Sequence, residues 1–146
     1  MIVTVLLAGM LAVQGGQVVV QGGPPPAPVP KNAPTALPDT PQAKRVRTYI
    51  EAFNTGDEAV YLRMQEEIMS PETPAKRPAT ERANMFARMR GDFGTLRITR
   101  VAATPRQIRA VIPDRDGNEA IFSFDFEANA PYRVTGIGVD IGHVER

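Results

Sequence analysis

The spacing of apolar residues changes near Thr95, and this change restricts the fold more than any other feature of the chain. Before it, apolar residues recur every three or four positions, as on one face of a helix. After it, apolar and polar residues alternate, as in strands with one buried face. Helices followed by consecutive strands predict an α+β fold, with the helices packed on one face of an antiparallel sheet.

The first two helices are predicted to meet at a two-residue break. Thr40 and Pro41 are typical of a helix start, with a hydroxyl cap and a proline in the first turn. Gly56 ends that helix because glycine adopts the left-handed conformation cheaply, and Asp57 can cap the next one. The expected apolar stripes are Ala43, Val46, Ile50 and Phe53 on the first helix, and Val60, Tyr61, Met64 and Ile68 on the second.

A third helix is expected from about Pro78 to Arg90, after Pro71 and Pro74 have broken the chain. The residues GDFG at 91–94 should end it. Its expected buried stripe is Ala79, Phe86, Met89 and Phe93.

Four strands are expected after the third helix. They should cover residues 95–104, 106–113, 119–128 and 132–142. The residues DRDGN at 114–118 predict a hairpin turn, because Asp-Gly tolerates positive φ. They lack the glycine and acid positions of a calcium loop. The third strand should turn its phenylalanines inward and Ser123, Asp125 and Glu127 outward.

Composition excludes several classes of function. The chain has 146 residues and a net charge of +1, which predicts one domain and no nucleic-acid partner. It has no cysteine, and its one histidine is His143, three residues from the end. Disulfides, thiolate chemistry and Cys/His metal clusters are therefore not expected, and no metal or cofactor is predicted.

The N-terminal part is expected to lie outside the folded domain. Residues 1–13 form an uncharged apolar run that is too short for a stable membrane span. Residues 1–15 therefore predict a signal peptide and export, to the periplasm or the medium, and the alternative is a buried N-terminal strand or helix. Residues 16–41 are rich in Gly and Pro and predict a linker that buries little, or a PxxP ligand. The folded domain should cover residues 42–146.

Three stretches resemble a known superfamily. YIEAFNTGDEAVYLRM at 49–64, followed by a four-strand meander, resembles nuclear-transport-factor-2-like (SnoaL-like) domains. The stretches at 75–101 and 130–141 are similar to the small domains that accompany secreted bacterial β-lactamase-type serine hydrolases. The resemblance implies a cone of three N-terminal helices on a curved four-stranded sheet. Those hydrolases use Ser-x-x-Lys, which neither Ser70 nor Ser123 begins here.

The function expected from this resemblance is a non-catalytic exported module that binds a small apolar ligand or a partner protein. The partner could be a secreted hydrolase or, in a homodimer, a second copy of the chain. The nuclear-transport-factor-2-like fold also hosts steroid isomerases and dehydratases. The alternative is therefore a small-molecule isomerase or dehydratase that uses a pocket carboxylate. The residues expected to line the ligand pocket are Phe53, Tyr61, Met64, Phe86, Phe122, Phe124, Ile137 and Val139.

No catalytic set is predicted, and three carboxylates come nearest to one. Asp125 and Glu127 should lie about 7 Å apart on the outward, solvated face of one strand. Asp140 shares a strand face with three glycines, which could leave room for a ligand or allow the sheet to curve. Tyr49, Tyr61 and Tyr132 are available as hydrogen-bond donors but are expected in the core and at its rim.

Overall fold

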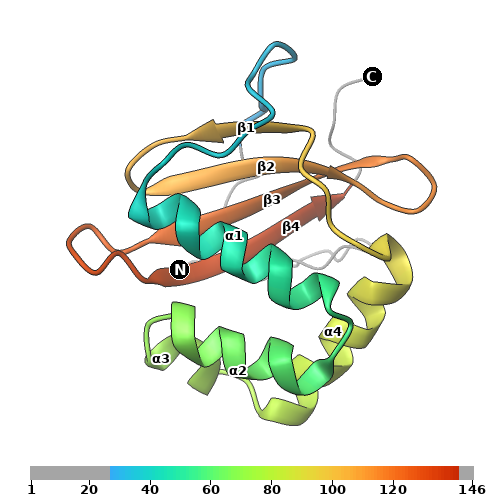
Figure 1. Ribbon diagram of the computed structural model, residues 1–146. Coiled ribbons are helices and arrows are strands. Elements are labelled where there is room, and N and C mark those ends of the chain that lie inside the picture. The colour runs from blue at the N-terminus through green and yellow to red at the C-terminus, as the bar shows by residue number, and fades with distance from the viewer. Residues whose placement is uncertain (1–26, 142–146) are drawn as a thin grey trace, which may run out of the picture.

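Helices precede strands along residues 27–141, the part of the chain that the computed structural model describes (Figure 1). This order confirms the α+β class. The predicted signal peptide, the start of the linker and His143 lie outside the described residues. The elements are α1 (Pro41–Asn54), α2 (Glu58–Ile68), α3 (Glu72–Ala75), α4 (Ala79–Phe93), β1 (Arg100–Ala103), β2 (Gln107–Pro113), β3 (Glu119–Phe126) and β4 (Val134–Ile141).

The four strands form one antiparallel sheet in the order β1-β2-β3-β4. Phe124 pairs with Ile108 on β2 and with Ile137 on β4, so these three side chains share a face. This inner face packs against the helices, and the ring of Tyr49 on α1 meets Phe124 edge-on at 5.3 Å between centroids. Figure 1 shows α1 in front of the sheet, with the other helices gathered along one side.

The break between the first two helices is confirmed in detail. The Thr40 side chain accepts a hydrogen bond from the amide of Ala43, and Pro41 opens α1. Gly56 follows α1 with φ of +73°, the left-handed conformation that stops a helix. Asp57 caps α2, and its Oδ1 accepts hydrogen bonds from the amides of Ala59 and Val60 at 2.9 and 3.2 Å.

Replacing Asp57 with alanine should lower the free energy of unfolding by about 1 kcal/mol, because two amides of the first turn lose their acceptor. Asp57→Asn should keep most of that stability, since its amide oxygen can still accept. Denaturant unfolding of both variants measures the difference. Equal losses in the two variants would mean that the carboxylate charge, rather than the hydrogen bonds, stabilises the turn.

The structure has a fourth helix where the sequence predicted only a break. The short α3 covers Glu72–Ala75, so it begins directly after Pro71 and includes Pro74. Proline is tolerated here because the first-turn amides of a helix have no partner within the helix. The prediction of three N-terminal helices is therefore wrong by one short turn.

The boundary between the last helix and the sheet also differs from the prediction. Helix α4 continues past Arg90 to Phe93, while Ala79 is exposed rather than buried. The first strand begins at Arg100 rather than Thr95. The reason lies on α1, where the Asn54 side chain accepts a hydrogen bond from the Leu96 amide at 2.7 Å and donates to the Leu96 carbonyl at 3.1 Å. The backbone at Leu96 therefore bonds to a helix instead of to β2.

Part of the predicted linker packs on the sheet. We name residues 27–34 the strap. Val29 in the strap is only 5% exposed and packs against Val111 and Ile121 on the outer face, away from the helices. The expectation that the whole linker buries little is therefore wrong at the strap, because the outer face carries apolar residues that need a cover. None of the helices in the described part is long and apolar enough to cross a bilayer.

Candidate functional site

The eight residues predicted to line a ligand pocket lie together in the core between the helices and the sheet. Each is at most 7% exposed. The ring of Tyr61 stacks on that of Phe86 at 4.4 Å, and Phe53 meets both rings edge-on at 6.0 and 5.4 Å. The elements that supply the eight are α1, α2, α4, β3 and β4. Their role as the walls of a ligand pocket stays a prediction.

A pair of tyrosines is the polar feature of this core. The hydroxyls of Tyr49 and Tyr61 lie 3.1 Å apart and are buried. From Tyr61 polar contacts continue to the surface, through Gln65 at 3.5 Å to the guanidinium of Arg82, which donates to the Gln65 side chain at 3.1 Å. Tyr49 and Tyr61 thus lie in the core, one of the two positions, core or rim, expected for the tyrosines of this chain. The sequence does not reveal the pair, because pairing depends on how α1 and α2 cross.

Burial controls the ionisation of both tyrosines. Desolvation raises the pKa of Tyr49 well above its usual value, and the neighbouring Tyr61 raises it further. Desolvation also raises the pKa of Tyr61 to about 12, although its hydrogen bonds and the Arg82 charge act in the opposite direction. Both hydroxyls therefore stay protonated near neutral pH, where they can donate and accept hydrogen bonds but cannot serve as bases.

The raised pKa values predict an alkaline loss of stability. Above pH 10 the unfolded chain releases the tyrosine protons while the folded chain retains them, so the free energy of the unfolded state falls relative to that of the folded state and the fold loses stability. The stabilisation is complete below pH 10, and the loss should reach roughly 1 kcal/mol per tyrosine for each pH unit up to about 12. Denaturant unfolding between pH 9 and 11.5 measures it. The double variant Tyr49→Phe/Tyr61→Phe should flatten this slope, and an unchanged slope would contradict the assignment.

The three candidate carboxylates do not meet in this interior. Asp125 accepts a hydrogen bond from the side chain of Gln107 at 3.0 Å. Glu127 accepts one from the backbone amide of Arg133 at 2.9 Å, and its Oε1 lies 3.9 Å from the Arg133 Nε. Both acids are half-buried, so the expectation that they lie in water is corrected by these partners. Asp140 pairs with Ile121 across β3 and β4, on the outer face.

The loop at 114–118 is a hairpin turn, as predicted. Oδ1 of Asp114 accepts hydrogen bonds from the amides of Asp116 and Asn118 at 2.9 and 2.8 Å, and Gly117 has φ of +88°. The first acid of the apparent calcium motif is thus committed to the turn itself. Within residues 27–141, no group of three or more histidine or acidic side chains is arranged to hold a metal ion.

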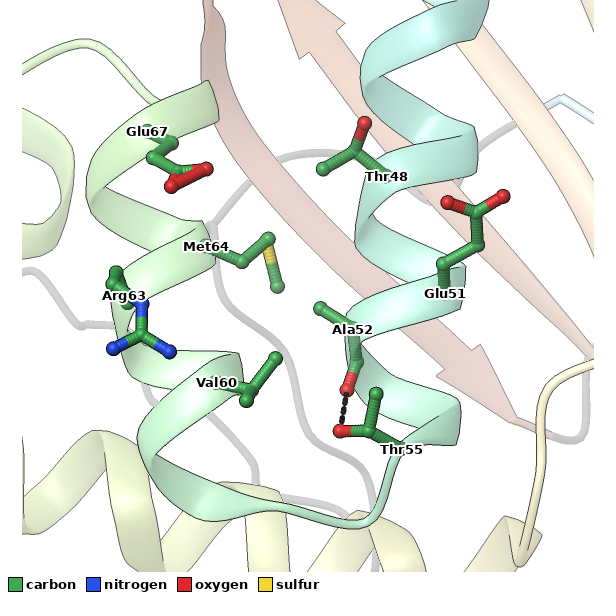
Figure 2. Close-up of a pocket in the computed structure, with 8 residues that line it drawn as sticks. All are labelled: Thr48, Glu51, Ala52, Thr55, Val60, Arg63, Met64 and Glu67. Carbon is green, nitrogen blue, oxygen red and sulfur yellow. Dashed lines mark hydrogen bonds between the residues drawn. The ribbon is translucent and has the colours of Figure 1, made fainter.

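A surface groove lies between α1 and α2 (Figure 2). It has a volume of about 270 Å³. Its floor is apolar and consists of Ala52, Val60 and Met64. Met64 belongs to the core and is only 3% exposed, and it also lines the floor of the groove. Of the eight predicted pocket residues, Met64 is the one that lines this groove.

Charged side chains border the groove. Glu51 stands on the α1 side, and Arg63 and Glu67 stand on the α2 side (Figure 2). All three are exposed, and none makes an ion pair or a side-chain hydrogen bond within the described part of the chain. Thr55 is already engaged, because its hydroxyl donates to the carbonyl of Ala52 at 2.7 Å. The groove thus combines an apolar floor with uncompensated charges on its borders.

Sequence reasoning identifies this groove only in part. It places Val60 and Met64 on the apolar stripe of the second helix but does not single out Thr48 or Glu51. The spacing of a single helix shows which side faces the core, but a groove forms where two helices diverge. No signal in the sequence specifies that divergence.

A second hollow lies beside Gly56, between the start of α2 and α4, with a volume of about 430 Å³. Phe86 and Arg90 reach it. Arg90 is committed to the structure, since its guanidinium donates to the carbonyls of Phe53 at 3.3 Å and Gly94 at 2.6 Å. The groove between α1 and α2 is therefore the better candidate for recognition.

Comparisons of this chain with family models, with curated proteins and with solved structures find no match. The groove is accordingly interpreted from its own geometry and chemistry.

Proposed function

We propose that this chain is a non-catalytic exported module of the nuclear-transport-factor-2-like type that binds a partner protein through the groove between α1 and α2. The observation that carries the proposal is the groove itself, with its apolar floor and its unpaired charges. Helices packed on one face of a four-stranded meander support the superfamily assignment. Export is proposed from the sequence of residues 1–15 alone.

The shape of the site favours a protein partner over a small free ligand. Pockets for small ligands enclose most of the ligand surface, whereas this groove is open along the helix surface. The eight core residues that could have lined an enclosed pocket pack against one another and are at most 7% exposed. An apolar side chain carried by another protein suits the groove better, because the partner's own surface completes the enclosure.

The charges on the borders indicate the chemistry of that partner. The borders carry two carboxylates, on Glu51 and Glu67, and one guanidinium, on Arg63. A basic residue next to the apolar anchor would neutralise the excess carboxylate, and opposite charges at the rim mainly raise the association rate and the selectivity. The proposed partner segment is therefore an apolar side chain flanked by Lys or Arg.

The arrangement of ionisable groups supports a binding role over the isomerase or dehydratase alternative. That chemistry needs a base within hydrogen-bond reach of the reacting group. Asp125 and Asp140, the two candidate bases, lie on the outer face, whereas the tyrosine pair lies on the inner one. We therefore expect Asp125→Asn and Asp140→Asn to leave partner binding unchanged.

A matched pair of substitutions on α2 tests the groove. Val60→Asp places a charge on the apolar floor, at a first-turn position where a helix tolerates aspartate. Ala59→Asp adds the same charge one position earlier, outside the groove. Peptides selected from a displayed random library against the full chain should carry an apolar residue beside Lys or Arg. Val60→Asp should weaken their binding at least about ten-fold, which corresponds to the loss of one buried aliphatic contact.

Two results would overturn this proposal. One is a set of selected peptides that bind Val60→Asp and wild type equally well. The other is an equal loss of binding in Ala59→Asp, which would indicate a general effect of charge. Circular dichroism of both variants establishes that the helices are intact.

A further inference from the structure

The outer face of the sheet carries an apolar patch that the helices do not cover. Val111 on β2 and Ile121 on β3 are directly paired and share this face. They are 0% and 5% exposed. The face of a sheet opposite its helices is commonly polar and solvated, so buried aliphatic residues here indicate that a segment packs on them.

The strap is that segment in this chain. Val29 packs on the apolar patch, and the guanidinium of Arg109 donates to the carbonyls of Ala27 and, at 2.9 Å, Pro28. Further along, the amide of Val101 on β1 donates to the Pro34 carbonyl at 2.8 Å. Figure 1 shows the strap, in blue, looping past β1 before the chain enters α1.

These contacts recognise two features of the docked segment, its free backbone carbonyls and one aliphatic side chain that serves as an anchor. Proline has no amide hydrogen, so a proline-rich segment makes few internal hydrogen bonds and most of its carbonyls can accept from outside. In the strap the Pro30 carbonyl accepts from the Ala33 amide, whereas the carbonyls of Ala27, Pro28 and Pro34 accept from the sheet. The sheet supplies donors from Arg109 and Val101 and a patch for an aliphatic side chain. Lys31 and Asn32 of the strap are not buried against the sheet, so the site is indifferent to the side chains there.

The strap leaves hydrogen-bonding capacity on this face unused. The hydroxyl of Ser123 and the Nε of Arg100 are buried and have no hydrogen-bond partner within the described residues. Ser123 is 9% exposed and is paired with Gly138, where an added Cβ would meet no described atom within 4 Å. Buried polar atoms without partners are costly, so a segment that reached them would bind this face better than the strap does.

From these observations we infer that the outer sheet face is a docking site for an extended, proline-containing segment of a partner protein with one aliphatic anchor. The strap occupies the site as an intramolecular competitor. Its partial fit allows a segment that satisfies Ser123 and Arg100 to displace it. This site is separate from the groove between α1 and α2 and does not depend on the function proposed for that groove.

Displacing the strap in the full chain tests the inference. The probe is a synthetic peptide of residues 24–36, titrated into the nitrogen-15-labelled chain and followed by NMR. In Val29→Asp the charged side chain should release the strap and shift the amide signals of Val101 and Ile121. Added peptide should return these signals toward their wild-type positions. The peptide concentration at half effect should be at least about ten-fold lower than for wild type, whose tethered strap competes at roughly millimolar effective concentration.

Controls separate this outcome from others. Lys31→Asp changes an exposed residue of the strap, so that variant should behave as wild type. A peptide that itself carries Val29→Asp should not bind. Val29→Ala, a milder substitution, replaces Val29→Asp if the latter does not fold. A folded variant whose signals do not respond to the peptide would overturn the inference. A wild-type dimer that Val29→Asp converts to monomer would assign the site to the strap of a second copy, and would overturn the assignment to a partner protein.

Discussion

Replacing Phe53 with alanine should lower the free energy of unfolding by about 4 kcal/mol. Phe53 is fully buried at the end of α1. Its ring contacts those of Tyr61 and Phe86, at 6.0 and 5.4 Å, and therefore joins α1 to α2 and α4. Removing it leaves a cavity that rigid aromatic neighbours cannot fill, and it also loses the edge-to-face contacts.

Denaturant unfolding measures this loss, and Phe53→Leu is its control. Leucine restores most of the buried apolar volume but not the aromatic contacts, so that variant should lose only about 1–2 kcal/mol. A loss below about 2 kcal/mol in Phe53→Ala would mean that α2 and α4 close the cavity. The three helices would then repack around the substitution more readily than the burial of Phe53 indicates.

The second large effect concerns Arg90, and Arg90→Ala should cost about 3 kcal/mol. The Arg90 guanidinium bonds to the carbonyls of Phe53 and Gly94, at the ends of α1 and α4. It also lies 5.6 Å from the centre of the Phe53 ring. Carbonyls at helix ends lack partners within the helix and carry partial negative charge, so a cation there stabilises both ends. Arg90→Lys should recover only part of the loss, because a single ammonium cannot reproduce the planar fork.

Gly56 and Arg90 should be coupled, since they touch. An added Cβ at Gly56 would lie 2.9 Å from Nη2 of Arg90, at a φ of +73°. Gly56→Ala should therefore cost about 1 kcal/mol for the backbone and about 1 kcal/mol more for moving a guanidinium already bonded to two carbonyls. In the Arg90→Ala background only the backbone cost should remain. A double-mutant cycle measures this coupling, and strictly additive losses would contradict the contact.

Helix ends and strand faces could be predicted because they depend on neighbours close in the chain. The cap at Thr40, the left-handed Gly56 and the cap at Asp57 each act within a few residues, and all three are confirmed. The inward-facing phenylalanines of β3 follow from the two-residue period of a strand. Even so, burial on both faces of β3 hides part of that pattern, because the strap covers Ile121.

The candidate sites depended on contacts between distant parts of the chain. Asn54 is hydrogen-bonded to Leu96, 42 positions further along the chain, and the first strand begins only at Arg100. Arg109 meets the strap across more than 80 positions. The groove exists only where α1 and α2 diverge, so its bordering residues have no shared sequence pattern. Periodicity reports which side of an element is apolar, but it does not report which other element covers that side.

The sequence by itself determined the α+β class, the turn between α1 and α2 and the alternation of the sheet, since these depend on local backbone preference and on the period of apolar residues. Only the tertiary structure decided that Tyr49 and Tyr61 share a hydrogen bond and that the proline-rich strap packs on the sheet. The physical reason is that each of these contacts joins elements far apart in the chain. Their partners are chosen by the packing of the whole fold, which no local spacing records.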